Sequence, residues 1–515
     1  MKLLLILLLP GCSDWTLFGR KDLGGGPNSP DDTAETTTPD TGHDPDTGDE
    51  PDPDTGERPC SAGELTLANA DPVRLREDAA EDDWEARYFG QLVQPGRDDG
   101  VPAIWVNAAR ESEPAVYLLT ATELSTTVGE HEEPVIYAGR WDGDLWLVRG
   151  GLTTREGAWE SSVWVMDDDG TDDGEAVWYL FHEPPEARTT TDDADVTIET
   201  YGYGGSNLSD LVVGDLDGDG LDDAVNFHGS GYNVFTAPFS SYYDARVDAD
   251  VELAIDAESY GALGGICVTA DLDEDGYADM ACGGGINIEE SETWESSYMG
   301  VYLGPMLERD SLGMPDIVYW TDEGVPPNLL GYSESNSGFS GLVPLGDVTG
   351  DGHPDLAVTS RDERYGDVDS SATFVLDSFE PGTWPIEEVE TVLVAPGHSY
   401  MPAGNAAQDL VRSAGDLNGD GMNDVLVSEK LDLTDPYQDT DHGSLYLVMG
   451  PVTGVVMLED LETRVVVPDM DDSLYSARWS SATDLDDDGR SEFTVTLFQW
   501  NEPSTMYLFR GCEDW

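Results

Sequence analysis

The sequence predicts an all-β protein built from repeated units, and three observations support this prediction. A nine-residue acidic pattern recurs five times between residues 215 and 492. Each copy is followed at once by a short run of apolar and β-branched residues, such as Leu356-Ala357-Val358, and a second such run follows after a polar stretch. Glycine, aspartate and β-branched residues dominate these units, so helix signals are weak. Self-similarity at a regular spacing is typical of repeat architectures.

The composition allows a large core and excludes one class of partner. Of the 515 residues 39% are apolar, and they include 14 Trp and 21 Tyr. Asp and Glu number 107 against 23 Lys and Arg, which makes the formal net charge -84. A charge of this sign and size repels a polyphosphate. We therefore expect no nucleic-acid partner.

Residues 1–12 have the character of a targeting segment. Lys2 supplies a positive start, residues 3–9 form an apolar run, and Cys12 follows a small residue. The segment resembles a bacterial lipoprotein signal, which implies that Cys12 carries the lipid and that the membrane is reached only through this anchor. Pro10 departs from the usual pattern, so ordinary signal cleavage is the alternative. The expected location is the bacterial cell envelope, as an outer-membrane or cell-surface lipoprotein, or otherwise the secreted fraction.

Residues 13–59 are predicted to be a disordered linker. They are acidic and rich in Pro, Asp, Thr and Gly, with three copies of Pro-Asp-Thr-Gly at 39–42, 45–48 and 53–56. Such a segment buries too little apolar surface to offset the entropy lost on ordering. The folded domain is therefore expected to occupy residues 60–515.

The repeated pattern is Asp-x-Asp/Asn/Thr-x-Asp-Gly-x-x-Asp/Glu, and its nine positions are numbered one to nine below. We name its copies loops one to five: Asp215–Asp223, Asp271–Asp279, Asp347–Asp355, Asp416–Asp424 and Asp484–Glu492. Two degraded copies precede them, at 99–106 and at 167–173, and the second has an acidic hairpin turn as its alternative interpretation. Counting both copies predicts seven units, and six remain if the second is not a unit.

The loops have the chemistry of a calcium site. Ca²⁺ takes six to eight oxygen ligands, and alternate acidic positions on a tight turn direct carboxylates to one point. The glycine at position six permits the turn, and position seven offers its carbonyl. About five ions are expected, with these ligands: Asp215, Asp217, Asp219, Leu221 and Asp223; Asp271, Asp273, Asp275, Tyr277 and Asp279; Asp347, Thr349, Asp351, His353 and Asp355; Asp416, Asn418, Asp420, Met422 and Asp424; Asp484, Asp486, Asp488, Arg490 and Glu492.

An EF-hand is the competing interpretation of these loops. An EF-hand needs a bidentate Glu at position twelve and a helix on each side. Here strand-like runs follow, and position twelve is Asn226, Cys282, Val358, Val427 or Val495. The EF-hand interpretation is therefore rejected.

Loops one to five, the apolar runs after them and strands such as Gly300-Val301-Tyr302-Leu303 resemble FG-GAP repeats, as in the N-terminal region of integrin α-subunits and VCBS-like bacterial proteins. The resemblance covers residues 208–510. It implies a β-propeller of four-stranded blades, seven or possibly six in number, with each calcium loop joining strands one and two. The last blade ends after its third strand, and Glu64-Leu65-Thr66-Leu67 is expected to complete it.

Four cysteines remain if Cys12 carries a lipid, and two disulfides are expected in an oxidising exterior. Cys267 and Cys282 flank one predicted hairpin loop, and closure of the propeller would bring Cys60 towards Cys512. Four buried free thiols are the alternative.

No catalytic motif is found in the sequence, and the seven histidines are scattered singly. The resemblance implies a calcium-binding, surface-anchored adhesion or ligand-binding module without catalytic activity, whose partner is an extracellular protein or carbohydrate. A secreted hydrolase or a carbohydrate-binding lectin on the same scaffold is the alternative. The loops between strands two and three, at 287–297, 361–371 and 429–442, are expected to form the binding face. Trp105, Trp164 and Trp178 are assigned to the blade core.

Overall fold

The computed structural model describes 24 segments of the chain. They are residues 64–66, 73–76, 93–98, 101–108, 115–120, 136–137, 145–149, 162–168, 175–185, 189–201, 211–227, 231–254, 263–286, 296–309, 311–320, 339–360, 370–396, 411–429, 444–461, 463–466, 474–481, 483–499, 502–513 and 515. Residues 1–63 lie outside this set, and with them Cys12, the predicted linker and Cys60.

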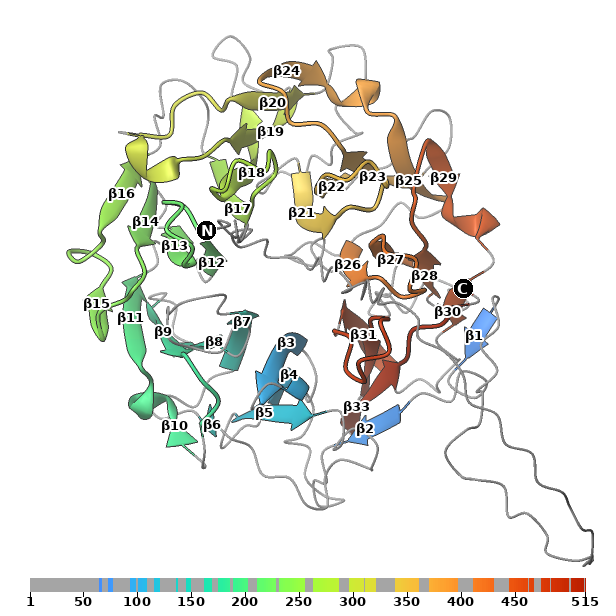
Figure 1. Ribbon diagram of the computed structural model, residues 1–515, viewed down its shortest axis with the longest axis horizontal. Helices are drawn as coiled ribbons and strands as arrows, with labels where there is room; N and C mark the ends of the chain where they lie inside the picture. The colour runs from blue at the N-terminus through green and yellow to red at the C-terminus, as the bar shows by residue number, and fades with distance from the viewer. Residues whose placement is uncertain are drawn as a thin grey trace, which may run out of the picture.

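The described strands form seven sheets that stand side by side in a ring, which defines a seven-bladed β-propeller (Figure 1). The predictions of an all-β fold and of seven blades are confirmed. Strand one of each blade lies nearest the centre, and strand four lies at the rim. In chain order the strands of blades one to three are β3 Val93–Asp98, β4 Val101–Ala108, β5 Ala115–Thr120 and β6 Ile136–Tyr137; β7 Leu145–Arg149, β8 Val163–Asp168, β9 Glu175–Phe181 and β11 Val196–Tyr201; β12 Leu211–Gly214, β13 Asp223–Phe227, β14 Gly231–Phe235 and β16 Val251–Ala254.

Blades four to seven complete the ring. Their strands are β17 Leu263–Ala270, β18 Asp279–Ile286, β19 Ser296–Tyr302 and β20 Ile317–Trp320; β21 Phe339–Gly346, β22 Asp355–Ser360, β23 Ser370–Leu376 and β25 Thr391–Pro396; β26 Val411–Gly415, β27 Asp424–Glu429, β28 Ser444–Val448 and β30 Arg464–Val466; β31 Leu474–Ser481, β32 Phe493–Gln499, β33 Glu502–Phe509 and, from the other end of the chain, β2 Val73–Arg76.

The buried apolar residues of the described segments form seven clusters, and each cluster lies between two neighbouring blades. A middle strand is therefore buried on both faces and reads as a continuous apolar run rather than an alternating one. In β4, for example, every residue after Val101 is buried. Trp105, Trp164 and Trp178 are fully buried in these clusters, which confirms their assignment to the core.

Blade seven is closed by β2, which pairs antiparallel with β33. The prediction that Glu64-Leu65-Thr66-Leu67 supplies this strand is wrong. In the structure β1 (Glu64–Thr66) pairs in parallel with β30 of blade six (Figure 1). The sequence could not separate these two roles, because both segments are short, contain at most two apolar residues and lie close to one terminus.

The position of β1 follows a rule that holds around the rim. Where the connection between strands three and four forms a short extra strand, that strand pairs in parallel with strand four of the preceding blade. The others are β10 Thr189–Thr190 on β6, β15 Tyr242–Asp244 on β11, β24 Gly382–Pro385 on β20 and β29 Val455–Met457 on β25. Short 3-10 helices occupy the same connections: η2 Thr191–Asp193, η3 Met306–Glu308, η5 Ile386–Glu388 and η7 Leu458–Asp460. Each connection therefore covers an edge that would otherwise expose unpaired backbone groups.

The two degraded repeats have different outcomes. The first lies at the predicted place, because residues 99–100 separate strands one and two of blade one. The second does not, since Asp167 and Asp168 end β8, which is strand two of its blade. The stretch at 167–173 therefore begins in strand two and lies before strand three, the position that its alternative interpretation requires. The count of seven was right although this loop was assigned wrongly.

The disulfide between Cys267 and Cys282 is present and joins β17 to β18, as predicted. Cys512 is buried and also disulfide-bonded. Its expected partner, Cys60, lies outside the described residues, so this pairing stays a prediction. No helix in the described part of the chain is long and apolar enough to cross a membrane.

If β2 closes the ring, truncating its buried side chain should destabilise the whole propeller. Leu75 is fully buried in the cluster between blades seven and one. We expect Leu75→Ala to lower the free energy of unfolding by about 3 kcal/mol, the usual cost of emptying such a site. Urea denaturation measures this change. Val247→Ala, at a side chain that is 76% exposed, is the control and should change it by less than about 0.5 kcal/mol. A Leu75→Ala variant as stable as the parent would contradict closure by β2.

Candidate metal sites

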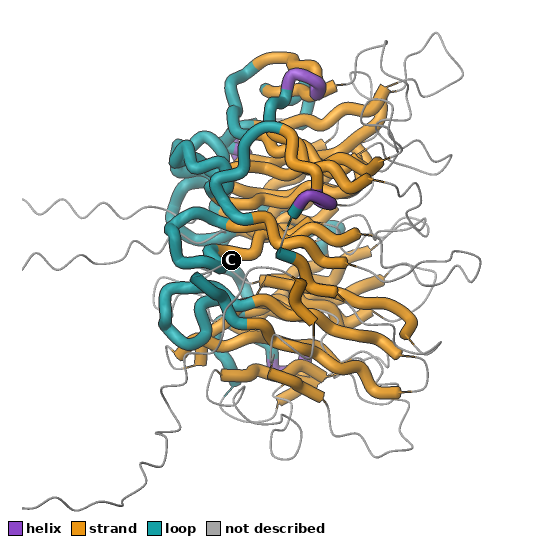
Figure 2. Tube along the Cα trace, turned by 90° about the vertical axis from the view of Figure 1, so that its right-hand side faces the viewer, coloured by secondary structure: helices purple, strands orange, loops and turns teal. Residues whose placement is uncertain are grey.

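All five acidic loops join strand one to strand two of their blades, and they therefore lie on one face of the propeller. They connect β12 to β13, β17 to β18, β21 to β22, β26 to β27 and β31 to β32. Figure 2 shows the described loops gathered on this side of the ring. The three segments expected to form the opposite, ligand-binding face fall largely at 287–295, 361–369 and 430–443, outside the described residues.

The carboxylate at position one organises each turn. In loop one, Asp215 Oδ1 accepts from the amide of Gly218 at 2.7 Å, and its Oδ2 accepts from the amide of Gly220 at 2.8 Å. Both glycines have positive φ angles, 73° and 85°, which a residue with a Cβ rarely adopts. The glycines at positions four and six thus allow the backbone to fold around the first aspartate.

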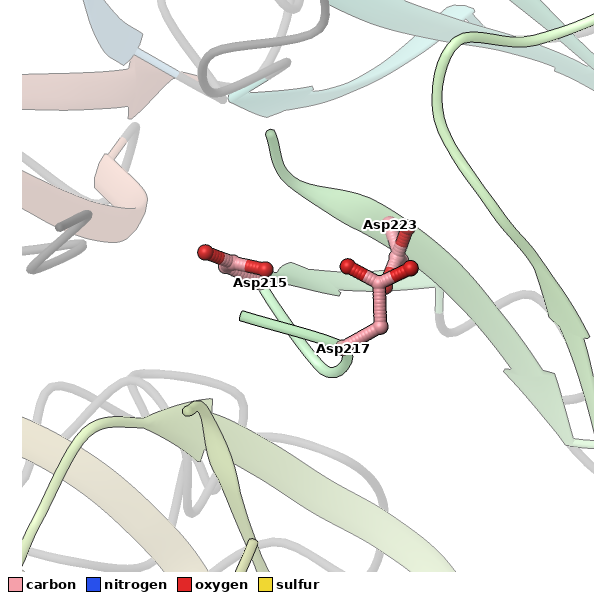
Figure 3. Close-up of side chains that lie close together, drawn as sticks. All are labelled: Asp215, Asp217 and Asp223. Carbon is pink, nitrogen blue, oxygen red and sulfur yellow. The ribbon is translucent and has the colours of Figure 1, made fainter. Parts of the chain in front are cut away.

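Three loops bring three carboxylates together. In these loops one ligand oxygen from each of three residues lies within 4.8 Å of the other two. Figure 3 shows the group in loop one side by side at the turn between β12 and β13. The groups are Asp215, Asp217 and Asp223; Asp271, Asp273 and Asp279; Asp484, Asp486 and Asp488.

The chemistry of this donor set fits a hard divalent cation. Ca²⁺ prefers carboxylate and carbonyl oxygens, and the loops offer both. Loops three and four have Thr349 and Asn418 at position three, which supply a neutral oxygen in place of a carboxylate. Those two sites therefore carry less negative charge for a cation.

Position five is oriented by the backbone of position seven. The amide of Met422 donates to Asp420 Oδ1 at 2.9 Å, and the other four loops repeat this bond over 2.9 to 3.0 Å. The carbonyl predicted as a ligand and the position-five carboxylate are thus held by one turn. Position five is exposed, and in loops four and five its second oxygen also accepts from a side chain: Asn418 Nδ2 lies 3.1 Å from Asp420 Oδ2, and Arg490 Nη1 lies 3.1 Å from Asp488 Oδ2.

Position nine has a role that the sequence analysis missed. Asp424 is fully buried, and its two oxygens accept from the amides of Leu417 at 2.7 Å and Gly450 at 2.8 Å. Leu417 opens the loop, whereas Gly450 lies beyond strand three. Asp223 and Asp279 make the same pair of bonds. This carboxylate therefore ties the loop to the end of strand three, whether or not it also binds an ion.

A sequence signal for this tie exists. The second donor is the residue before a proline, in Ala237-Pro238, Gly304-Pro305 and Gly450-Pro451, and each pair follows strand three of its blade.

Two arginines, one within loop five and one beyond β33, contact the carboxylates of this loop. Arg490 pairs with Asp488 at 3.1 Å and Arg510 pairs with Asp486 at 3.4 Å. Arg510 was not among the predicted site residues, and it partly neutralises the carboxylates of this loop.

Burial raises the pKa of the position-nine carboxylates far above the ordinary range. The pKa rises to about 7 for Asp223, Asp279, Asp355 and Asp424, and to about 8 for Glu492. Loss of hydration is the largest cause, neighbouring carboxylates add to it, and backbone amides oppose it. Without a cation these groups compete for protons near neutral pH, and a bound cation would favour their charged form.

No protein-family model matches the chain, and no curated protein matches it. Among solved structures, crystal structures of BBS1N in complex with ARL6DN, soaked with mercury or lead, resemble it at 8% and 10% identity with TM-scores of 0.37. The match covers 85% of this chain and 97% of theirs. The crystal structure of the V. cholerae biofilm matrix protein Bap1 has 13% identity and a TM-score of 0.28 over 64% of this chain, and this chain spans 40% of that one. No functional argument follows from likenesses of this degree.

Fold and loops together define the class: a seven-bladed β-propeller with acidic loops, on one face, that could bind metal ions.

Substitutions at positions five and nine of loop four should separate the ligand role from the structural role. Asp420→Asn keeps the oxygen that accepts from Met422 and loses only an exposed contact with Asn418. Its stability in chelator at pH 8 should therefore lie within about 0.5 kcal/mol of the parent, and it should lose substantial stabilisation only in calcium. Asp424→Asn replaces one acceptor oxygen with an NH₂ group, which can only donate and which would face a buried backbone N–H. It should therefore lower the free energy of unfolding by about 2 kcal/mol even in chelator. Thermal melts in both buffers measure this. Equal behaviour of the two variants in chelator would contradict a separate role for position nine.

The raised pKa values predict how pH changes the effect of calcium. A carboxyl whose folded pKa lies above its unfolded value, about 4, contributes stability below that value. This contribution is lost as pH rises towards about 7 for the four buried aspartates. A cation bound to the charged form offsets the loss. The calcium-induced rise in Tm should therefore be small at pH 5 and large at pH 8, with sodium chloride of equal ionic strength as the control. An equal rise at both pH values would contradict these pKa shifts.

Proposed function

We propose that this chain is a calcium-stabilised, ligand-binding propeller of the FG-GAP type that acts in adhesion at a bacterial cell surface and catalyses no reaction. The observation that best supports it is the grouping of three carboxylates within 4.8 Å in loops one, two and five. The loop positions between strands one and two agree with what the FG-GAP resemblance implies. The identity of the ion as calcium, membership of the FG-GAP family and the adhesive role are all parts of this proposal.

In this proposal the ions have a structural role. The first and last carboxylates of loops one and two are buried, so an ion there would lie against the blade rather than on an open surface. A buried ion next to a loop that is tied to strand three stabilises the blade. The ligand, an extracellular protein or carbohydrate, would then bind through the opposite face.

The remaining parts of the proposal concern the N-terminal region. Cys12 would carry the lipid, and residues 13–59 would hold the propeller away from the membrane as a flexible, acidic tether. The envelope location rests on this anchor. Trp105, Trp164 and Trp178 are fully buried, so these three side chains cannot serve as platforms for sugars.

Calcium titration of the chelated protein tests the stabilising role directly. Extracellular sites bind calcium at about 10⁻⁴ to 10⁻³ M. At tenfold excess over such a constant, each occupied site should add about 1.4 kcal/mol to the free energy of unfolding. The melting temperature should therefore rise by many degrees at millimolar calcium, and magnesium should act more weakly because it demands a tighter octahedral shell. A melting temperature that does not respond to calcium would contradict the proposal.

A further inference from the structure

Neighbouring acidic loops are joined by a backbone hydrogen bond that recurs at equivalent positions. The amide at position eight of one loop donates to the carbonyl at position one of the loop in the preceding blade. Ala278 donates to Asp215 at 2.6 Å, Asn423 to Asp347 at 2.9 Å and Ser491 to Asp416 at 2.6 Å. Position one is the aspartate whose carboxylate organises its own turn, so each of these bonds anchors a predicted ligand of the neighbouring site.

A side chain contact accompanies each of these bonds. The residue at position seven packs over the glycine at position four of the preceding loop. A Cβ on Gly218 would lie 2.5 Å from the ring of Tyr277, and one on Gly350 would lie 3.0 Å from Met422 Sδ. Arg490 covers Gly419 in the same way. Because position seven also offers the ligand carbonyl, an ion in one loop fixes a residue that rests on the next loop.

Position two adds a third connection between adjacent loops. Its side chain is apolar in all five loops and is buried in the cluster between its own blade and the following one. Leu216 of loop one, for example, lies in one cluster with Ala278 and Met280 of blade four. The metal loops are therefore part of the seams between blades.

The series is interrupted once, between loops two and three. Position eight of loop three is Pro354, which has no amide hydrogen to donate. Position four of loop two is Glu274 rather than glycine, and it takes a positive φ of 58°. In place of the backbone bond, His353 Nδ1 lies 2.8 Å from Glu274 Oε2, between two exposed side chains. This junction lacks the anchor on position one.

We propose that ion binding is coupled between loops that share the position-eight bond, and that Pro354 divides the five sites into a pair, loops one and two, and a trio, loops three to five. This inference rests on the proposed function, since it needs cations in the loops. An ion in loop two orders Tyr277 and Ala278, and the amide of Ala278 then holds Asp215 in place for an ion in loop one. The first ion bears the entropy cost of ordering these shared residues. The second ion does not bear this cost again, so it binds more tightly than the first.

Terbium luminescence can report on the pair alone. Tb³⁺ replaces Ca²⁺ in oxygen sites and emits when a nearby aromatic ring is excited. Tyr277 supplies a carbonyl in loop two, and its ring lies on loop one. The signal that is lost in Tyr277→Phe therefore belongs to these two loops. We expect this signal to rise sigmoidally with Tb³⁺ in the full chain, with a Hill coefficient between 1 and 2, because two sites are coupled.

Variants at position eight test the bond itself. Ala278→Pro removes the donor, and Pro354 shows that a proline fits at this position of the loop. Ala278→Ser is the matched control, because it keeps the amide and serine occurs there in loop five. The Hill coefficient should fall to about 1 in Ala278→Pro and stay unchanged in Ala278→Ser. A steep curve that persists in Ala278→Pro would overturn the inference.

A second pair of variants leaves the backbone intact, so the test does not depend on the folding of Ala278→Pro. Asp275→Asn weakens loop two and should lower the Tb³⁺ affinity of loop one at least about fivefold. Asp351→Asn weakens loop three across the Pro354 junction and should leave the Tyr277 signal unchanged. An effect of Asp351→Asn equal to that of Asp275→Asn would overturn the division at Pro354.

The outcomes also separate this inference from the proposed function. No Tyr277-dependent signal in the parent chain means that neither loop holds an ion, and both proposals fail. A hyperbolic signal that millimolar calcium displaces means that ions bind independently, and only the coupling fails.

Discussion

Every blade of this protein has two apolar faces, and the need to cover both determines the rest of the structure. A sheet that is apolar on both sides cannot face water, so each blade must lie between two others and the row must close into a ring. The seven core clusters lie at the seven seams between blades, including the one between the last blade and the first. The chain meets this requirement at its ends, where β2 joins β33 of blade seven.

The acidic loops depend on the same seams. Position two of each loop is a buried core residue, and position nine is a buried carboxylate that in loops one, two and four ties the loop to the end of strand three. Removing these carboxylates from water is costly, which is why burial raises their pKa. A cation would relieve this cost at the place where blades meet. The candidate metal sites and the blade packing are in this way connected through shared residues.

Much of this was predictable from local sequence. The five acidic patterns lie between strands one and two as predicted, and Cys267 pairs with Cys282 across the expected hairpin. The errors arose where signals were short or ambiguous. The stretch at 167–173 is acidic and contains Gly170, but Val165 stands at its first ligand position, and its first two residues end strand two. The segments 64–66 and 73–76 are both short strands with few apolar residues, and only their pairing partners distinguish them.

The sequence by itself determined the class of fold and the acidic, oxygen-rich chemistry of the five loops, because these follow from residue types at fixed spacings within one repeat. The tertiary structure decided which N-terminal strand closes the ring, and which amides reach the carboxylate at position nine. It also decided that Pro354 interrupts the series of bonds between loops. These contacts join residues that are distant in the sequence, across one blade, between blades or from both ends of the chain, and only the folded ring brings them together.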